Sequence, residues 1–193
     1  VQTCALPILI IEELRNAHPA QRQQKSVAKP AKIDAKSLKG ATRAPMPKAM
    51  KPQLASQQDD PPAGEGWIHE IKLDGYRTIA LLDGGKVKLL TRTGIDWTDR
   101  YGVLADAFTA LPAKQAIIDG EIVVVDEQGI THFSDLQQAL HDGASDRLTF
   151  FAFDLMYLDG YDLTKGRLAD RKALLQALLA PVVTASSALQ YSD

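Results

Sequence analysis

The chain has 193 residues, 45% of them hydrophobic, and a formal net charge of −2 at pH 7. This is enough apolar material for one domain of ordinary size, and no apolar run approaches the roughly 20 residues that a membrane-spanning helix needs. The single cysteine, Cys4, excludes an internal disulfide and a cysteine-based metal cluster. Such cysteine usage is typical of a reducing compartment, so we expect a cytoplasmic protein.

The N-terminal quarter differs from the rest of the chain in charge. Residues 15–52 hold ten Lys or Arg and one acidic residue, a net charge of +9, whereas the remaining segments carry −11. The stretch is rich in Ala, Lys, Pro and Gln without sustained periodicity, which predicts a basic flexible linker. It could contact nucleic-acid phosphates or serve only as a solubilising spacer. The first residues, VQTCALPI, resemble a translated sequencing adapter, and we expect residues 1–14 to be a non-native start.

Residues 53–193 have the pattern of a folded domain. Short β-prone runs separated by turn residues predict strands at 67–73, 76–82, 86–92, 115–126 and 148–158. Apolar residues at helical spacing predict helices at 99–111, 132–142 and 168–180. Because most of the strands follow one another through turns, with helices between some of them, we predict an α+β domain of antiparallel sheets with flanking helices.

Strict alternation along the predicted strands assigns side chains to faces. In strand 67–73 it places Glu70 and Lys72 on the less apolar face, and in strand 115–126 it places Glu121 beside Asp119. In strand 148–158 it groups Phe151, Phe153, Leu155 and Tyr157. These aromatic side chains could belong to a core or could form a stacking surface.

A lysine stands near the end of the first predicted strand, in HEIKLDGYR. By itself Lys72 could be a solvent-facing lysine beside a hairpin turn at Asp74-Gly75. However, Lys72, Asp74, Gly75 and Arg77 form the pattern Lys-x-Asp-Gly-x-Arg. This pattern resembles the nucleotidyl-acceptor motif of the covalent nucleotidyltransferase superfamily, which contains the ATP-dependent DNA ligases and the mRNA capping enzymes.

Three further stretches resemble the next motifs of that superfamily in the same order. They are LLTRTG at 89–94, IIDGE at 117–121 and FFAFDLMYLDG at 150–160. Within the superfamily, PPAGEGWIHEIKLDGYRTIALLDGGKVKLLTRTGIDWT most resembles the ligase domain of bacterial ligase D. The resemblance implies an ATP-grasp-like nucleotidyltransferase domain over residues 53–193.

The resemblance implies that Lys72 attacks the α-phosphorus of ATP and becomes Lys72-AMP. A free lysine has a pKa of about 10.4 and must lose its proton to act as a nucleophile. A divalent metal, nearby arginines and desolvation all disfavour the ammonium form. The implied cofactors are ATP and Mg²⁺ or Mn²⁺, and the motifs identify no metal ligand.

The resemblance also implies roles for residues around the nucleophile. Arg77 and Arg92 would hold phosphate or ribose oxygens with planar donor forks, Glu121 would accept hydrogen bonds from ribose hydroxyls, and Asp74 and Gly75 would shape the turn that aims Lys72. Phe153 would lie over adenine, unless it is a core residue. Near the adenine amino group the resemblance places Glu70, otherwise a plain surface residue, and the neighbouring Ile71.

The later motifs of the family, which bind metal and the α-phosphate, are not found after FDLMYLDG, and neither is an OB-fold domain. We therefore expect a partial adenylation domain that does not ligate by itself. The implied partners are nicked or broken double-stranded DNA, a Ku-type end-binding protein and neighbouring phosphoesterase or polymerase domains.

Two other functions remain open at this point. An mRNA-capping-type guanylyltransferase would use the same lysine with GTP, although the stretches around EIKLDGYR and LLTRTG favour the ATP-dependent DNA enzymes. Alternatively, the chain is a noncatalytic nucleic-acid-binding fragment in which residues 15–52 bind phosphates.

Overall fold

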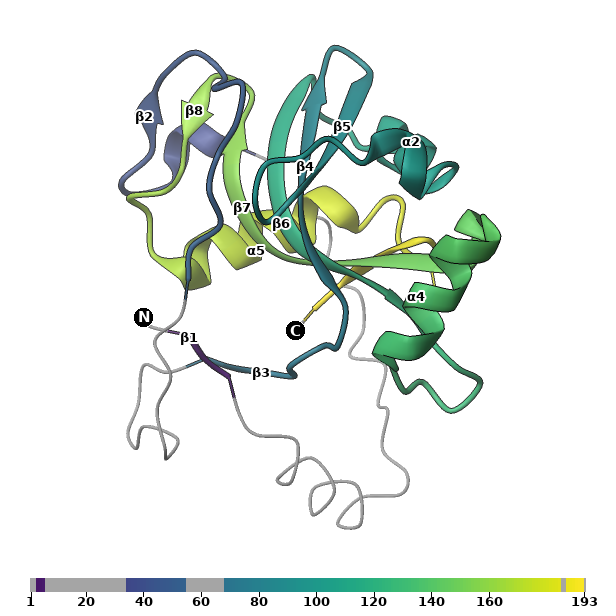
Figure 1. The fold of residues 1–193 in the computed structure, drawn as a ribbon. Helices are drawn as coiled ribbons and strands as arrows, with labels where there is room; N and C mark the ends of the chain where they lie inside the picture. The colour runs from purple at the N-terminus through teal and green to yellow at the C-terminus, as the bar shows by residue number, and fades with distance from the viewer. Residues whose placement is uncertain (1–2, 6–33, 55–67, 185–186, 193) are drawn as a thin grey trace.

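The computed structural model describes residues 3–5, 34–54, 68–184 and 187–192. Its main sheet has the strand order β2-β8-β7-β6-β4-β5, and all of these neighbours are antiparallel (Figure 1). Strand β9 adds to β7 in parallel. The strands are β2 (Thr42–Arg43), β4 (Tyr76–Asp83), β5 (Lys86–Thr91), β6 (Gln115–Val124), β7 (Leu148–Leu158), β8 (Tyr161–Asp162) and β9 (Leu189–Tyr191).

A separate pair of parallel strands lies beside the main sheet. The pair consists of β1 (Thr3–Ala5) and β3 (Ile68–Glu70). The predicted α+β class is confirmed, and the main sheet is antiparallel as predicted, apart from β9.

Helical elements pack mainly against one face of the sheet. They are η1 (Ala35–Ser37), α2 (Thr98–Tyr101), α3 (Leu104–Ala107), η2 (Phe108–Ala110), α4 (Phe133–Asp142), η3 (Ser145–Arg147) and α5 (Leu168–Leu179). Leu136 and Leu175 bring α4 and α5 into the larger core cluster. Among the described residues, no helix has the length and apolar character needed to cross a membrane.

The single helix predicted over residues 99–111 is wrong, because the chain breaks it into α2, α3 and η2. Gly102 ends α2 with φ 53°, a left-handed conformation that favours glycine. Val103, which helical spacing would place on the apolar face, is instead 57% exposed. Leu104 and Phe108 still reach the core as expected.

The opposite face of the sheet carries a smaller apolar cluster. It consists of Ile79, Leu81, Leu90, Ile117, Met156 and Tyr157. Met46 and Met50 from the N-terminal segment pack against this cluster. The Tyr157 hydroxyl also donates to the carbonyl oxygen of Ala44 at 2.9 Å. The sheet thus has helices on one face and an extended segment, residues 44–54, on the other, which we call the N-terminal strap.

The linker predicted for residues 15–52 therefore does not describe residues 34–52. Met46 and Met50 supply apolar contacts, and β2 pairs with β8 through ladder hydrogen bonds. These contacts stabilise residues 34–52 against the sheet, although their basic composition predicted a linker. Residues 15–33 lie outside the described residues, and for them the linker remains a prediction.

Strand β7 has two irregularities that change which side chains face the strap. Its pairing with β6 shifts between Ile117 and Ile118 and again between Asp119 and Gly120, which leaves Met156 and Phe153 unpaired. A β-bulge lets two consecutive residues point to the same side of a sheet. The predicted grouping of Phe153 with Leu155 is accordingly wrong, because Leu155 packs in the helix-side core.

Candidate functional site

Lys72 lies in an irregular segment between β3 and β4. Strand β3 ends at Glu70, where its pairing with β1 ends, so the prediction that Lys72 sits within a strand is wrong. The Lys72 side chain is 49% exposed and its Nζ lies 3.9 Å from Oδ1 of Asp74. Ile71 is 68% exposed. Lys72 is therefore open to a ligand arriving from solvent.

Gly75 has a structural role that differs from the predicted hairpin turn. Strands β3 and β4 belong to different sheets, so Asp74 and Gly75 do not connect a hairpin. A Cβ atom on Gly75 would lie 2.1 Å from the carbonyl oxygen of Ile122. Only glycine allows the chain to pass this close to β6 and then to enter β4 at Tyr76.

Arg77 is held in place on β4. Its Nε and Nη2 donate to the Asp119 carboxylate at 2.9 and 2.7 Å, and Asp119 is fully buried on β6. Nη2 also donates to the main-chain oxygen of Gln53 at 2.9 Å. Burial lowers the pKa of Arg77, but the hydrogen bond and charge of Asp119 raise it, and the net direction is upward.

A guanidinium has five N–H donors, and the contacts with Asp119 and Gln53 use three of them. No described residue accepts from the two hydrogens of Nη1, which remain for a ligand. Asp119 occupies the Nε/Nη2 edge of the guanidinium, and Gln53 accepts the other hydrogen of Nη2, so Arg77 can offer an incoming oxygen one nitrogen rather than a two-nitrogen fork.

Glu121 and Phe153 flank this arginine. Glu121 pairs with Arg77 across β4 and β6. Burial raises the pKa of Glu121 to about 7; Arg77 and Lys72 oppose this shift, and Asp119 reinforces it. The guanidinium carbon of Arg77 lies 4.8 Å from the centre of the Phe153 ring, within cation–π range. Lys72, Arg77, Glu121 and Phe153 thus gather at one site, where Glu121 can donate or accept a proton near neutral pH.

Glu70 is occupied by a partner that the sequence reasoning missed. Lys172 of α5 donates to Oε1 of Glu70 and, at 2.8 Å, to the carbonyl oxygen of Ser192. Lys172 is buried and also lies over the Tyr191 ring. Glu70 is therefore not a plain surface residue: its carboxylate ties the segment before Lys72 to helix α5.

A further buried ion pair, between Arg171 and Asp154, lies next to the Lys172–Glu70 pair. Arg171 donates through Nε and Nη2 to the Asp154 carboxylate at 2.7 and 2.8 Å, and both side chains are buried. The sequence held a signal for both buried cations of α5. Arg171 and Lys172 occupy the i+3 and i+4 positions of a helical stripe that runs from Leu168 to Leu175.

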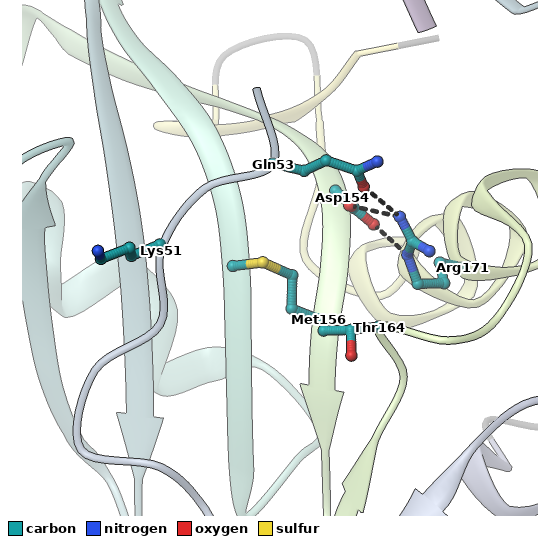
Figure 2. Close-up of a pocket in the computed structure, with 6 residues that line it drawn as sticks. All are labelled: Lys51, Gln53, Asp154, Met156, Thr164 and Arg171. Atoms are coloured by element: carbon teal, nitrogen blue, oxygen red, sulfur yellow. Dashed lines mark hydrogen bonds and ion pairs between the residues drawn. The ribbon is translucent and has the colours of Figure 1, made fainter. Parts of the chain in front are cut away.

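A cavity of about 280 Å³ opens beside Arg171 (Figure 2). It is lined by Lys51, Gln53, Asp154, Met156, Thr164 and Arg171. None of the residues that the sequence assigned to a site lines this cavity. Figure 2 shows Gln53 of the strap beside Asp154 and Arg171.

Arg92 makes no contact that brings it into this group of described residues. It is exposed in the turn after β5, and no hydrogen bond or ion pair to another described residue holds its side chain. Within the described ranges, no three His, Cys, Asp or Glu side chains group as metal ligands.

Comparison with known proteins gives this geometry a context. The family model for the ATP dependent DNA ligase domain matches residues 49–192. The multifunctional non-homologous end joining protein LigD of Pseudomonas aeruginosa is 43% identical over 152 residues, which cover 79% of this chain and 18% of that protein. The LigD DNA repair protein of Mycobacterium tuberculosis H37Rv is 41% identical over 112 residues, covering 58% of this chain and 14% of that protein.

Solved structures show the same likeness. The ligase domain of M. tuberculosis LigD superposes with a TM-score of 0.54 at 38% identity, covering 64% of this chain and 38% of that one. A mycobacterial DNA ligase D complexed with ATP and MES gives a TM-score of 0.52 at 35% identity, covering 63% and 38%. The chain thus spans less than a fifth of these two LigD proteins and well under half of the solved ligase domains.

Proposed function

The chain belongs to the ATP-dependent DNA ligase domain family, and from this premise we propose that it transfers AMP from ATP to Lys72, the first step in sealing DNA breaks. The observation that carries the proposal is the gathering of an accessible Lys72 with Arg77 and Glu121, whose pKa responds to both cations.

The proposed step forms one bond and breaks another. Neutral Lys72 Nζ attacks the α-phosphorus of ATP, a phosphoramidate N–P bond forms, the bond to pyrophosphate breaks, and Nζ loses a proton. Adenylation of this kind needs the lysine to reach the nucleotide from an open side, and the 49% exposure of the Lys72 side chain allows that approach.

The flanking residues would hold the nucleotide. Arg77 would bind a ribose or phosphate oxygen through Nη1, Glu121 would hydrogen-bond a ribose hydroxyl, and Phe153 would stack on adenine with the ring face that Arg77 leaves free. Oε2 of Glu70, to which no described residue donates, and the exposed Ile71 would lie near the adenine base. Arg92 would contact the phosphates from solvent.

A divalent metal, Mg²⁺ or Mn²⁺, is the second cofactor that we propose. Such ions are commonly bound through one or two carboxylates together with substrate phosphates. The described residues do not form a metal site of their own.

For the longer protein we propose end joining or nick sealing of double-stranded DNA in the bacterial cytoplasm. The support is that the Pseudomonas and Mycobacterium relatives are named end-joining proteins. A Ku-type end-binding protein and neighbouring phosphoesterase or polymerase domains are the proposed partners. Because the chain spans so little of these relatives, we propose that it performs adenylation at most and does not ligate by itself.

The test is the intact mass of the protein after incubation with magnesium and either ATP or GTP. We expect an AMP-sized increase with ATP alone, lost in Lys72→Ala and retained in Lys86→Ala, which removes an exposed lysine at the start of β5. A GMP-sized increase would instead support a capping-type guanylyltransferase. The absence of an adduct in the unmodified chain would overturn adenylation by this chain.

A noncatalytic DNA-binding role is the second candidate, favoured by the charge of +9 over residues 15–52. It predicts salt-dependent DNA binding that survives Lys72→Ala and disappears when these basic residues are neutralised. DNA binding that is independent of the basic residues would rule it out.

A further inference from the structure

The last residues of the N-terminal strap lie beside the guanidinium groups of two arginines. The strap begins where the amide of Ala44 donates to the carbonyl oxygen of Gly160 at 3.0 Å, and Met46 and Met50 then pack on the sheet. At the far end Gln53 is exposed and Leu54 is 60% exposed. Since little apolar surface is buried there, polar contacts must hold the end of the strap.

Gln53 makes those contacts with two different arginines. Its main-chain oxygen accepts from Nη2 of Arg77 at 2.9 Å. Its side-chain Oε1 accepts from Nη2 of Arg171 at 3.3 Å, as Figure 2 shows. One residue therefore joins an arginine of strand β4 to an arginine of helix α5.

The two arginines are each paired with a buried aspartate, and these aspartates are neighbours. Asp119 of β6 and Asp154 of β7 are cross-strand partners. Each carboxylate accepts hydrogen bonds from two nitrogens of its arginine. Gln53 thus bridges two adjacent ion pairs and links their positions.

The bridge decides which donor of Arg77 a ligand meets. Asp119 sets the plane of the guanidinium, but Nη2 would still have one free hydrogen if Gln53 were absent. Because Gln53 accepts that hydrogen, Nη1 is the one nitrogen of Arg77 whose hydrogens meet no acceptor among the described residues. An oxygen of a bound nucleotide then has one defined approach to Arg77 rather than two competing ones.

We propose that Gln53 is a positioning residue of the nucleotide site. Its side chain anchors the strap to Arg171, and its carbonyl oxygen thereby holds Arg77 with Nη1 directed at the nucleotide. The inference rests on the proposed function for its consequence in adenylation, but the contact itself can be tested without nucleotide.

The first arm of the experiment follows arginine side-chain N–H signals by NMR in the full chain without nucleotide. Arg77→Lys and Arg171→Lys assign the two signals. We expect Gln53→Ala to shift and broaden the Arg77 Nε–H signal and Gln176→Ala to leave it unchanged. Gln53→Glu should preserve the signal, because Glu keeps a side-chain oxygen that accepts from Arg171. Gln176 is an exposed glutamine of α5 and serves as the matched control. An Arg77 signal that is identical in Gln53→Ala would overturn the inference.

The second arm measures the rate of lysyl-AMP formation against ATP concentration. We expect Gln53→Ala to raise KM for ATP about three- to tenfold, the range of one hydrogen bond, with little change in the melting temperature. Because Gln53 acts through Arg77, it should have no further effect in an Arg77→Ala background. Additive effects of the two substitutions would contradict the proposal. If the unmodified chain forms no adduct, adenylation fails as a function, and the first arm alone decides on Gln53.

Discussion

The site has two halves that are held in very different ways. Arg77 stands on β4 between β5 and β6, with three donors engaged. Lys72 lies outside any strand, half exposed, with a single ion pair at 3.9 Å. The binding half is thus fixed by the sheet, whereas the segment with the nucleophile is held at its ends, by the Glu70–Lys172 pair and by Gly75 against Ile122. A short segment can therefore keep its nucleophile accessible when contacts hold it on both sides.

The largest effect is expected at the buried Asp154–Arg171 pair, which Gln53 links to Arg77 of the fixed half. Arg171→Met would leave the buried Asp154 without its partner, and the loss of one member of a buried pair costs about 3–5 kcal/mol. Guanidinium chloride unfolding measures this loss. Arg167→Met, an exposed arginine just before the same helix, should cost less than about 0.5 kcal/mol. Equal losses of unfolding free energy in the two variants would show that burial of the Asp154–Arg171 pair does not determine the cost.

Gly75→Ala tests the anchor after Lys72. The new Cβ would meet the backbone of Ile122, which cannot rotate away, so a loss of about 1–3 kcal/mol is expected, as for other overpacked sites. Gly129→Ala is the comparison, because Gly129 has a positive φ but nothing within 4 Å of its Cβ position. That substitution should cost only about 1 kcal/mol. A Gly75→Ala protein of unchanged melting temperature would contradict the close approach to β6.

Lys172→Met tests the anchor before Lys72. It leaves Glu70, 16% exposed, without its cation, and a buried group left unsatisfied costs about 1–3 kcal/mol. Hydrogen exchange should accelerate at residues 71–74 more than in β4. The double variant with Glu70→Gln should recover part of the loss, and a double variant no better than Lys172→Met would show that the pair is not the anchor.

The smallest expected effect is a change in the pKa of Glu121, because the charge of Lys72 acts on this carboxyl. Lys72 lowers the pKa of Glu121, which burial raises to about 7, so Lys72→Ala should move that pKa higher still. Carboxyl NMR titration of Glu121 measures the shift, and Lys86→Ala is the control. An unchanged Glu121 pKa in Lys72→Ala would mean that the two side chains do not interact.

The same carboxyl predicts a pH dependence of stability. Its folded pKa of about 7 exceeds the ordinary value of 4.5, so the folded state binds the proton more tightly. Its contribution to stability is present below about pH 4.5 and is lost as the pH rises through 7. Glu121→Gln should remove this part of the pH dependence in denaturant titrations between pH 5 and 8, and an unchanged slope would contradict the raised pKa.

Much of the fold followed from local patterns in the sequence. Strands β4 and β7 and helices α4 and α5 lie within one or two residues of their predicted limits, because alternation and helical stripes are properties of neighbouring residues. The hairpin between β4 and β5 likewise depends on residues that are neighbours in the sequence. Gly84 and Gly85 adopt φ of 57° and 83°, the positive values that a tight hairpin turn of this kind requires.

Local sequence patterns fix the positions of these elements and the order of the motifs that contain Lys72, Arg77 and Glu121. The contacts that hold these residues arise only when the chain has folded. Gln53 meets Arg171 across 118 residues of chain, and Glu70 meets Lys172 across 102. The irregularities that leave Phe153 unpaired depend on how β7 pairs with β6. No periodicity within one segment encodes such partners, because they come together only when distant elements pack.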